Sequence, residues 1–278
     1  MPEGVHRPGR DADVVQCLLT YAGFVSSVRL TFWGVRARAV PRALARMGLD
    51  RVELRRAAAT GLRFAKLLGT GDGRTFTMRD ADPRHWGLLT VWDDDAAADR
   101  FEAAGTTHRR WDALADERLD VHLTPLSSRG RWSRGEPFGN PTPAPAPGPV
   151  ASITRAKIRP TRMRRFWQVV PQVSADLHAV PGMLLAVGIG EAPIGVQGTF
   201  TIWDGEAALR EFAHRRAPHV AAMRASTDGG WFAEELFARF RLDRLHGRFA
   251  EVEFDTYPVV GSPQRGNSAG SSPAEFPR

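Results

Sequence analysis

The sequence predicts an α+β fold made of two copies of one unit, and three observations support this. Residues 89–93 (LTVWD) return as residues 200–204 (FTIWD). In both halves a Phe follows the Trp after nine positions, and a His follows the Phe after seven: Trp92, Phe101 and His108; Trp203, Phe212 and His219. A glycine-spaced segment precedes each copy, at 69–73 and at 188–190. Equal spacings in two halves indicate an internal duplication.

The first half begins with loosely alternating residues 28–33, which predict a strand. Residues 36–58 have apolar positions at helical spacing, and we expect Gly48 to interrupt that helix. Residues 62–68 and 86–92 then read as strands, joined through a glycine turn that requires positive φ.

Asp93, Asp94 and Asp95 predict the start of a second helix, since acidic side chains satisfy the free N–H groups there. A strand at 119–126 completes the half. The order β-α-β-β-α-β is that of a ferredoxin-like unit.

The second half repeats this order after prolines at every second position from Pro141 to Pro149, which predict an extended linker. We expect strands at 150–158, 183–189 and 199–203, and helices at 160–179, 205–214 and 231–240. The predicted organisation is an extension at 1–27, a first repeat at 28–138, a linker at 139–149, a second repeat at 150–260 and a disordered tail at 261–278.

A single such unit leaves one face of its sheet bare, so the two units are expected to pair face to face. The result is a pseudo-dimer that resembles a dimeric α/β barrel, with room between the sheets for an apolar ligand.

Composition limits the function classes. The chain has 278 residues, 42% of them hydrophobic and 25% charged, as in folded globular proteins. A lone Cys17 excludes an intrachain disulfide and a site held by several thiolates. With neither a long apolar run nor a secretory signal, a cytoplasmic protein is expected.

The net charge of +7 is carried almost wholly by arginine, since Lys66 and Lys157 are the only lysines. These arginines are either scattered over solvated faces or, through clusters at 162–165 and 215–216, attract an anionic membrane surface. Neither half has the aromatic strand motif of ferredoxin-like RNA binders, so nucleic acid is not an expected partner.

Four blocks carry a family resemblance: 129–138 (RGRWSRGEPF), 151–159 (ASITRAKIR), 188–193 (GIGEAP) and 230–240 (GWFAEELFARF). In this order, within residues 28–245, they resemble the spheroidene monooxygenase family of acyclic-carotenoid 2-ketolases. The extension, the Pro-Ala run and the Ser-rich tail lie outside the family's core. The resemblance implies an oxygenase that uses O₂ and haem to oxygenate an acyclic carotenoid at C-2, giving an alcohol and then a ketone. Neither glycine segment extends to Gly-x-Gly-x-x-Gly, so electrons are expected from an external donor such as a ferredoxin.

Site residues follow from the resemblance and from analogy with haem-degrading enzymes of the same barrel class. His219 is the expected haem ligand, with His108 as the alternative and Cys17 as a third. Arg155 either holds a haem propionate inside the barrel or faces solvent. Four aromatic residues either line the polyene channel or pack helix against sheet: Trp167, Trp203, Trp231 and Phe232.

Two other functions stay open at this point. A cofactor-free oxygenase of the antibiotic-biosynthesis type shares the barrel. A non-catalytic protein that binds haem or an apolar ligand is the second alternative.

Overall fold

The computed structural model describes residues 26–56, 61–71, 80–191, 196–215, 217–250 and 252–255. The first half comprises β1 (Ser27–Val35), a 3₁₀ turn (Ala37–Ala39), α2 (Val40–Arg56), β2 (Leu62–Gly71), β3 (Ala81–Trp92), α3 (Asp95–Ala104), α4 (Thr106–Asp112) and β4 (Ala115–Gly130). The second half comprises β5 (Val150–Ile158), a 3₁₀ turn (Pro160–Arg162), α5 (Met163–His178), β6 (Met183–Gly190), β7 (Val196–Trp203), α6 (Glu206–Arg215), α7 (Ala217–Gly229), β8 (Phe232–Phe249) and β9 (Val252–Phe254).

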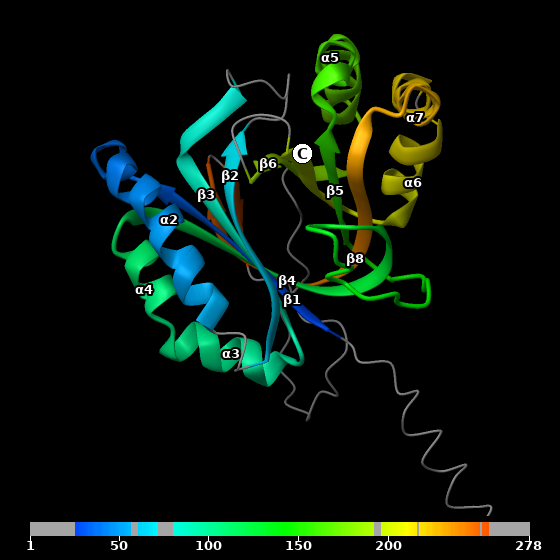
Figure 1. The fold of residues 1–278 in the computed structure, drawn as a ribbon. Coiled ribbons are helices and arrows are strands. Elements are labelled where there is room, and N and C mark those ends of the chain that lie inside the picture. Colours follow the sequence, from blue (N-terminus) through cyan, green and yellow to red (C-terminus); the bar gives the residue numbers. More distant parts are fainter. Residues whose placement is uncertain are drawn as a thin grey trace, which may run out of the picture.

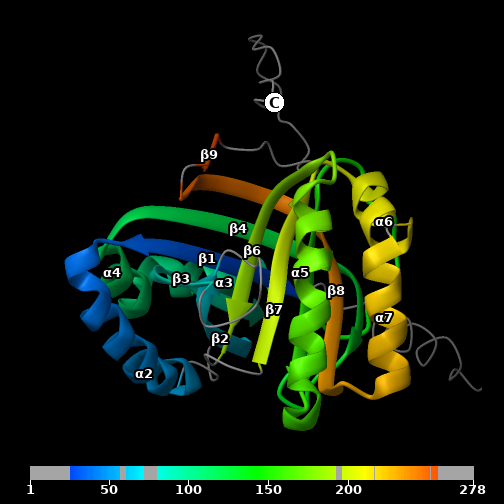
Figure 2. The same cartoon turned by 90° about the horizontal axis from the view of Figure 1, so that it is seen from above.

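Eight strands close into a barrel in the order β4-β1-β3-β2-β6-β7-β5-β8, because β8 also pairs with β4. Helices α2, α3 and α4 cover the outside of the first half, and α5, α6 and α7 cover the second (Figure 1). The view from above shows the two helical layers on opposite sides of the strands (Figure 2). The predicted α+β barrel of two fused ferredoxin-like repeats is confirmed.

The duplication is visible in the strand registers. Trp92 ends β3 and Trp203 ends β7, and each pairs with the first residue of the equivalent strand, β1 or β5. The Trp92 and Phe101 rings lie 4.9 Å apart, and the Trp203 and Phe212 rings 5.6 Å apart. The repeated histidines occupy the third position of α4 and of α7. The equal spacings therefore reflect equal places in the fold.

Residues 231–240 are not the predicted helix, since β8 begins at Phe232. Leu236, Ala238 and Phe240 are buried in alternation, and β8 pairs with both β4 and β5. Over this short window the apolar positions fit both a helical and a strand period, and the two neighbouring strands decide the outcome.

Four glycines of the two segments do not form the predicted turns, while Gly73 lies outside the described residues. Gly69 and Gly71 lie within β2, and Gly188 and Gly190 lie within β6, without positive φ. These residues join the two repeats, because Gly69 pairs with Gly190 and Gly71 pairs with Gly188. At Gly71 a Cβ would lie 2.6 Å from the carbonyl oxygen of Asp80, so a side chain there would clash with backbone.

The predicted start of α3 agrees with the structure, and the predicted break in α2 does not. The Asp94 side chain accepts a hydrogen bond from the backbone N–H of Ala97 at 2.7 Å and caps α3, as expected. Gly48, however, does not interrupt α2. It is exposed, and the cost of about 1 kcal/mol for a helical glycine is overcome where the rest of the helix packs on the sheet.

The barrel interior is packed with apolar side chains from both halves, including Phe32, Leu89, Phe200 and Phe240. The Phe32 and Phe200 rings lie 5.8 Å apart across the two sheets. In the described part of the chain this space is a core, so the expected ligand space must be sought outside it.

Residues 139–149 contain neither helix nor strand, as the prolines predict. Cys17, most of the extension and the tail beyond residue 255 lie outside the described residues. In the part of the chain that the structure describes, no helix has the length and apolar character needed to cross a membrane.

Candidate functional site

The four sequence blocks meet around the side chain of Arg155, on β5. This side chain is only 5% exposed, which excludes the solvent-facing alternative. Its terminal nitrogens bind Glu191 Oε1, at 2.9 Å, and a carboxylate oxygen of Glu234. The guanidinium lies 5.6 Å from the ring centroid of Trp132. Arg155 therefore joins the end of β6, the start of β8 and the segment after β4.

Glu191 is the centre of this cluster. It accepts hydrogen bonds from Lys66 Nζ at 2.6 Å and from Trp132 Nε1 at 2.7 Å, besides Arg155. Burial alone would raise the pKa of Glu191, but the hydrogen bond from Lys66 and the charges of Lys66 and Arg155 hold that pKa below its usual range. The carboxylate is thus kept ionised beside two cations.

The cluster fills a gap between the two repeats. Among the residues that the structure describes, the β4–β8 seam has eleven residue pairs, whereas the β2–β6 seam has three. Beyond those three pairs, Phe64 and Lys66 on β2 are met by the segment after β4. The Phe64 and Trp132 rings lie 5.4 Å apart, and Lys66 Nζ donates to Ser133 Oγ at 2.6 Å. Side chains, not backbone, close the barrel here.

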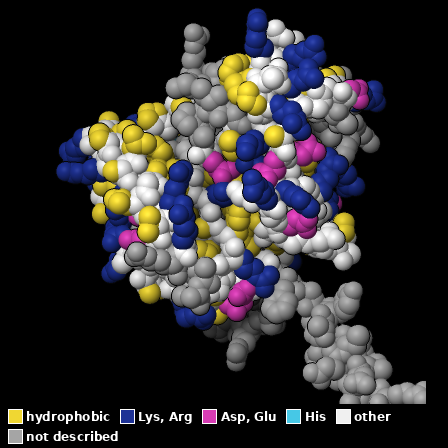
Figure 3. All heavy atoms as spheres, viewed as in Figure 1, with side chains coloured by type: hydrophobic (Ala, Val, Ile, Leu, Met, Phe, Trp, Pro, Cys, Tyr) yellow, Lys and Arg dark blue, Asp and Glu magenta, His cyan; other side chains and the backbone are white. Residues whose placement is uncertain are grey.

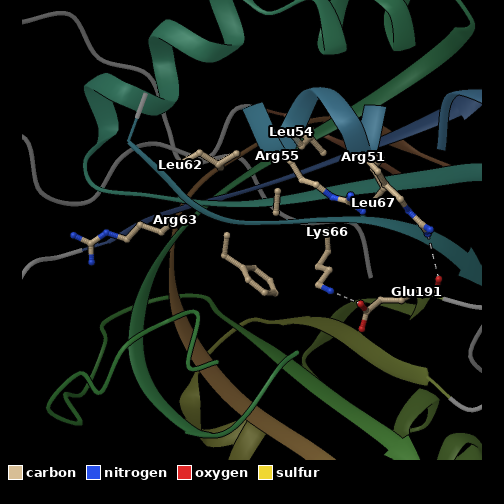
Figure 4. A pocket seen from close by; sticks show the side chains of 10 residues that line it. Arg51, Leu54, Arg55, Leu62, Arg63, Lys66, Leu67 and Glu191 are labelled. Atoms are coloured by element: carbon tan, nitrogen blue, oxygen red, sulfur yellow. Dashed lines mark hydrogen bonds and ion pairs between the residues drawn. The ribbon is translucent and has the colours of Figure 1, made fainter. Parts of the chain in front are cut away.

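Two adjoining pockets open along this short seam, under α2. One of about 570 Å³ is lined by Arg51, Arg55, Phe64, Lys66 and Glu191, among others (Figure 4). In the close-up, Lys66 and Arg51 both point toward Glu191, and Arg51 donates to its backbone carbonyl at 3.5 Å.

The second pocket, of about 340 Å³, runs along the four seam glycines beneath Leu44, Met47 and Trp86. Most of the surface that lines this pocket is apolar. Arg51 and Glu191 line both pockets, so the polar cluster stands where they meet.

The layer between the second sheet and its helices differs from that of the first half in its aromatic residues. In the first half, Trp33 pairs with Trp86 across β1 and β3, and Trp33 stacks on Trp111 of α4 at 5.5 Å. The equivalent pair in β5 and β7 is Ala156 with Gln197.

Other positions of the second layer also hold smaller or more exposed residues than their equivalents in the first. The position equivalent to Trp111, three residues after the repeated His, is Ala222. Thr31 is 3% exposed, while its equivalent Thr154, also on a central strand, is exposed. The second helix–sheet layer therefore has no indole at the three positions equivalent to Trp33, Trp86 and Trp111.

The two repeated histidines stand in these contrasting layers. His108 is 4% exposed, with its ring 5.4 Å from Trp33 and 5.7 Å from Phe101. Burial, and to a lesser degree the charge of Arg118, lowers the pKa of His108 to about 4. Its Nδ1 has no hydrogen-bond partner among the described residues. His219 lies in α7, and its side chain is outside the described set.

The four predicted aromatic site residues all belong to the helical side of the second half. Trp203 is fully buried beside Phe212, and Trp231 is 5% exposed just before β8. Phe232 is half-buried, 6.3 Å from the ring of Phe166 on α5. Trp167, also on α5, has a buried Nε1 without an acceptor in the described structure. None of the four lines the two seam pockets, and their role at a polyene remains a prediction.

Sequence reasoning missed His85, whose ring is held between two carboxylates at one end of the barrel. Its Nδ1 lies 2.5 Å from Asp82 Oδ2, and its Nε2 lies 2.6 Å from Glu117 Oε1. Burial opposes protonation, but the hydrogen bonds to both carboxylates raise the pKa of His85 above its usual value. The spacing of Asp82 and His85 was the only local signal, because Glu117 comes from β4.

No protein-family model matches the sequence. The chain is 40% identical over 183 residues to the spheroidene monooxygenase of Rhodobacter capsulatus, covering 65% of this chain and 76% of that protein. It is 41% identical over 180 residues to the spheroidene monooxygenase of Rubrivivax gelatinosus, covering 65% and 68%. For the spheroidene monooxygenase of Cereibacter sphaeroides the identity is 36% over 181 residues, covering 65% and 56%.

Solved structures share the fold at low sequence identity. An aldoxime dehydratase is 10% identical with a TM-score of 0.50, covering 78% of this chain and 81% of that chain. A second aldoxime dehydratase, in complex with butyraldoxime, is 9% identical with a TM-score of 0.51, covering 78% and 79%. These likenesses support the architecture alone.

Proposed function

Because the chain belongs to the spheroidene monooxygenase family, we propose that it oxygenates an acyclic carotenoid at C-2 with the help of a bound haem. Family membership makes it an oxidoreductase that acts as a carotenoid monooxygenase. The C-2 position, the haem and an external electron donor such as a ferredoxin are the proposed refinements.

The observation that best supports a haem is the second helix–sheet layer. A flat macrocycle needs space between two surfaces, and the second layer has Ala156 and Gln197, with less side-chain volume, where the first has the Trp33–Trp86 pair. His219 is the candidate axial ligand, because α7 borders this layer and the His has the same place in α7 as the buried His108 has in α4. The orphaned Nε1 of Trp167, on neighbouring α5, offers a donor to a polar group of the ligand.

The structure bears on two other residues that were expected to contact haem, Arg155 and His108. Both terminal nitrogens of Arg155 are already bound to carboxylates, so we do not assign Arg155 to a haem propionate. His108 is enclosed by aromatic rings and faces neither seam pocket. When bound, haem supplies the activation of O₂ that attack on an unactivated C–H bond requires.

The chain's own residues position the substrate and exclude water. The apolar pocket under α2, floored by the seam glycines, suits a slender polyene that has no polar groups to satisfy. Met47 and Trp86 line this pocket, and the ion pair of Lys66 and Glu191 lies at its polar end. A hydroxyl or keto end group would find hydrogen-bond partners in this ion pair, whereas a hydrocarbon end would not.

Two measurements test this proposal. The purified protein, reconstituted with haem, is expected to show a Soret absorption band. With O₂, a reductase and ferredoxin, it is expected to convert an acyclic carotenoid such as neurosporene into 2-hydroxy and 2-keto products, identified by mass spectrometry. Turnover without haem would favour the cofactor-free alternative, and a Soret band without turnover would favour a binding protein.

A further inference from the structure

We propose that the outer face of α2 is a membrane-docking surface that binds an anionic bilayer and brings the seam pockets to it. This inference rests on the proposed function for its purpose, but the docking itself can be measured without any activity.

The first observation is where exposed apolar side chains gather. Among the described residues, the four exposed large hydrophobic side chains are Leu44, Leu49, Val52 and Val252, and three of them lie on α2. Leu44 is 63% exposed, Leu49 55% and Val52 48%. Three such residues within three turns of one helix form a patch, whereas a single exposed one is ordinary.

The second observation is the pattern on the helix. Leu44, Gly48 and Val52 follow one another at four-residue spacing, and Leu49 lies beside them, so they share one side of α2. Exposed arginines flank this strip: Arg42, Arg51 and Arg55. The space-filling view shows hydrophobic and arginine side chains next to each other on the side of the molecule where α2 lies (Figure 3). An apolar strip with arginine borders is typical of helices that lie in the bilayer interface.

The fold itself does not require this strip. In the second repeat, 123 positions later (172 − 49), the residue equivalent to Leu49 is Gln172, which is exposed, whereas Leu44 and Val52 correspond to the apolar Trp167 and Ala175. The position of Leu49 is thus polar in one half and apolar in the other. The difference points to a use for the apolar version.

The third observation is that the strip borders the pockets. Leu44 lines the glycine-floored pocket, and Arg51 and Arg55 line the larger one. An acyclic carotenoid is a long hydrocarbon that dissolves in the bilayer and not in water. If α2 lies in the interface, Leu44, Arg51 and Arg55 bring the edges of both pockets next to the phase that holds such a substrate.

Vesicle co-sedimentation tests the docking directly. We expect the haem-loaded full chain to bind phosphatidylcholine vesicles that contain phosphatidylglycerol, more weakly at high salt, and to bind pure phosphatidylcholine poorly. The double variant Leu49→Gln, Val52→Gln is expected to lose binding about tenfold. Arg42→Gln is expected to lose about fivefold. The matched control, Val252→Gln on β9, should bind like the parent chain.

A second pair of variants tests the rival surface. Arg164→Gln and Arg165→Gln remove exposed charges from the arginine cluster at the start of α5. Loss of binding there with full binding of the Leu49→Gln, Val52→Gln variant would overturn the proposal. So would failure of the parent chain to bind anionic vesicles.

An activity assay separates this inference from the proposed function. We expect the Leu49→Gln, Val52→Gln variant to convert detergent-dispersed carotenoid normally and vesicle-embedded carotenoid slowly. Vesicle binding by the parent chain without conversion in either form would leave the docking intact and refute the proposed function. Normal conversion in both forms, with unchanged vesicle binding by the variant, would refute the docking and leave the function intact.

Discussion

The substitution Ala156→Trp would restore, in the second helix–sheet layer, the indole that Trp33 supplies to the first. A buried Trp removes about 150–250 Å² from water, which at about 25 cal/mol per Å² is worth roughly 4–6 kcal/mol. Ala156 is partly exposed, and we take about half of that burial as attainable for an indole at this position. We therefore expect the haem-free protein to become more stable by about 2 kcal/mol.

The sign of this change is the informative quantity. If the second layer were already filled, the added ring would overpack it and destabilise the protein by about 1–3 kcal/mol. In the first layer the rings of Trp33 and His108 lie 5.4 Å apart. An indole placed likewise near His219 would stand where the macrocycle is proposed to lie, so haem occupancy should fall at least tenfold.

Urea unfolding of the haem-free protein and haem titration followed by the Soret band measure the two effects. Val252→Trp is the control for size, because residue 252 is exposed on β9, and its stability should change by less than about 0.5 kcal/mol. Trp33→Ala should cost about 3–5 kcal/mol and spare haem. A destabilised Ala156→Trp protein that still binds haem fully would refute the reasoning.

Four further outcomes are expected. His219→Ala should lose most haem with its circular dichroism unchanged, while His108→Ala keeps haem; the opposite pattern would reassign the ligand. The free energy of unfolding should fall by about 3 kcal/mol as the pH falls from 6.5 to about 4, because in this range His108 takes up a proton in the unfolded chain and stays neutral in the folded one. The variant His108→Leu should lack this loss of stability in urea unfolding. His85, whose folded pKa is raised, should add stability below pH 6.5 that disappears as pH rises through the folded pKa, and unfolding midpoints of His85→Asn should lack this dependence. Glu191→Gln should cost about 3 kcal/mol by leaving Lys66 without a carboxylate and Arg155 with Glu234 alone, whereas the exposed Glu136→Gln should change the unfolding free energy by less than about 0.5 kcal/mol; equal effects would show that the cluster adds no stability.

The duplication, the order of most elements and the barrel could be predicted from the sequence, because they depend on spacing and on alternating burial. The bounds of β5 (Val150–Ile158) agree with the prediction, since that strand has a clear pattern and a proline linker before it. Residues 231–240 could not be assigned correctly, because their period is ambiguous and only the contacts with β4 and β5 select a strand. The seam glycines likewise resembled turns because their partner segment is far away in the chain.

The candidate site was predictable only in part. The Arg155 block was recognised, but its partners Glu191 and Glu234 lie 36 and 79 residues away, and nothing local indicates that they converge. Lys66 was noted only as one of two lysines, yet it holds the centre of the cluster. His85 was overlooked because one of its two carboxylates comes from another strand. Long-range pairing of strands creates these sites, and short motifs do not encode it.

The fusion of the two repeats frees each half from the other's constraints. In a barrel assembled from two identical chains, every substitution appears twice, so a helix–sheet layer emptied for a ligand would be emptied on both sides and would be doubly destabilising. Here the Trp33–Trp86 pair can keep packing the layer of one half, while the other half has Ala156 and Gln197 at the equivalent positions. The same division lets α2 carry Leu49 at a surface position where α5 carries Gln172. A single gene thus gains an asymmetric molecule, in which each half can take on different tasks.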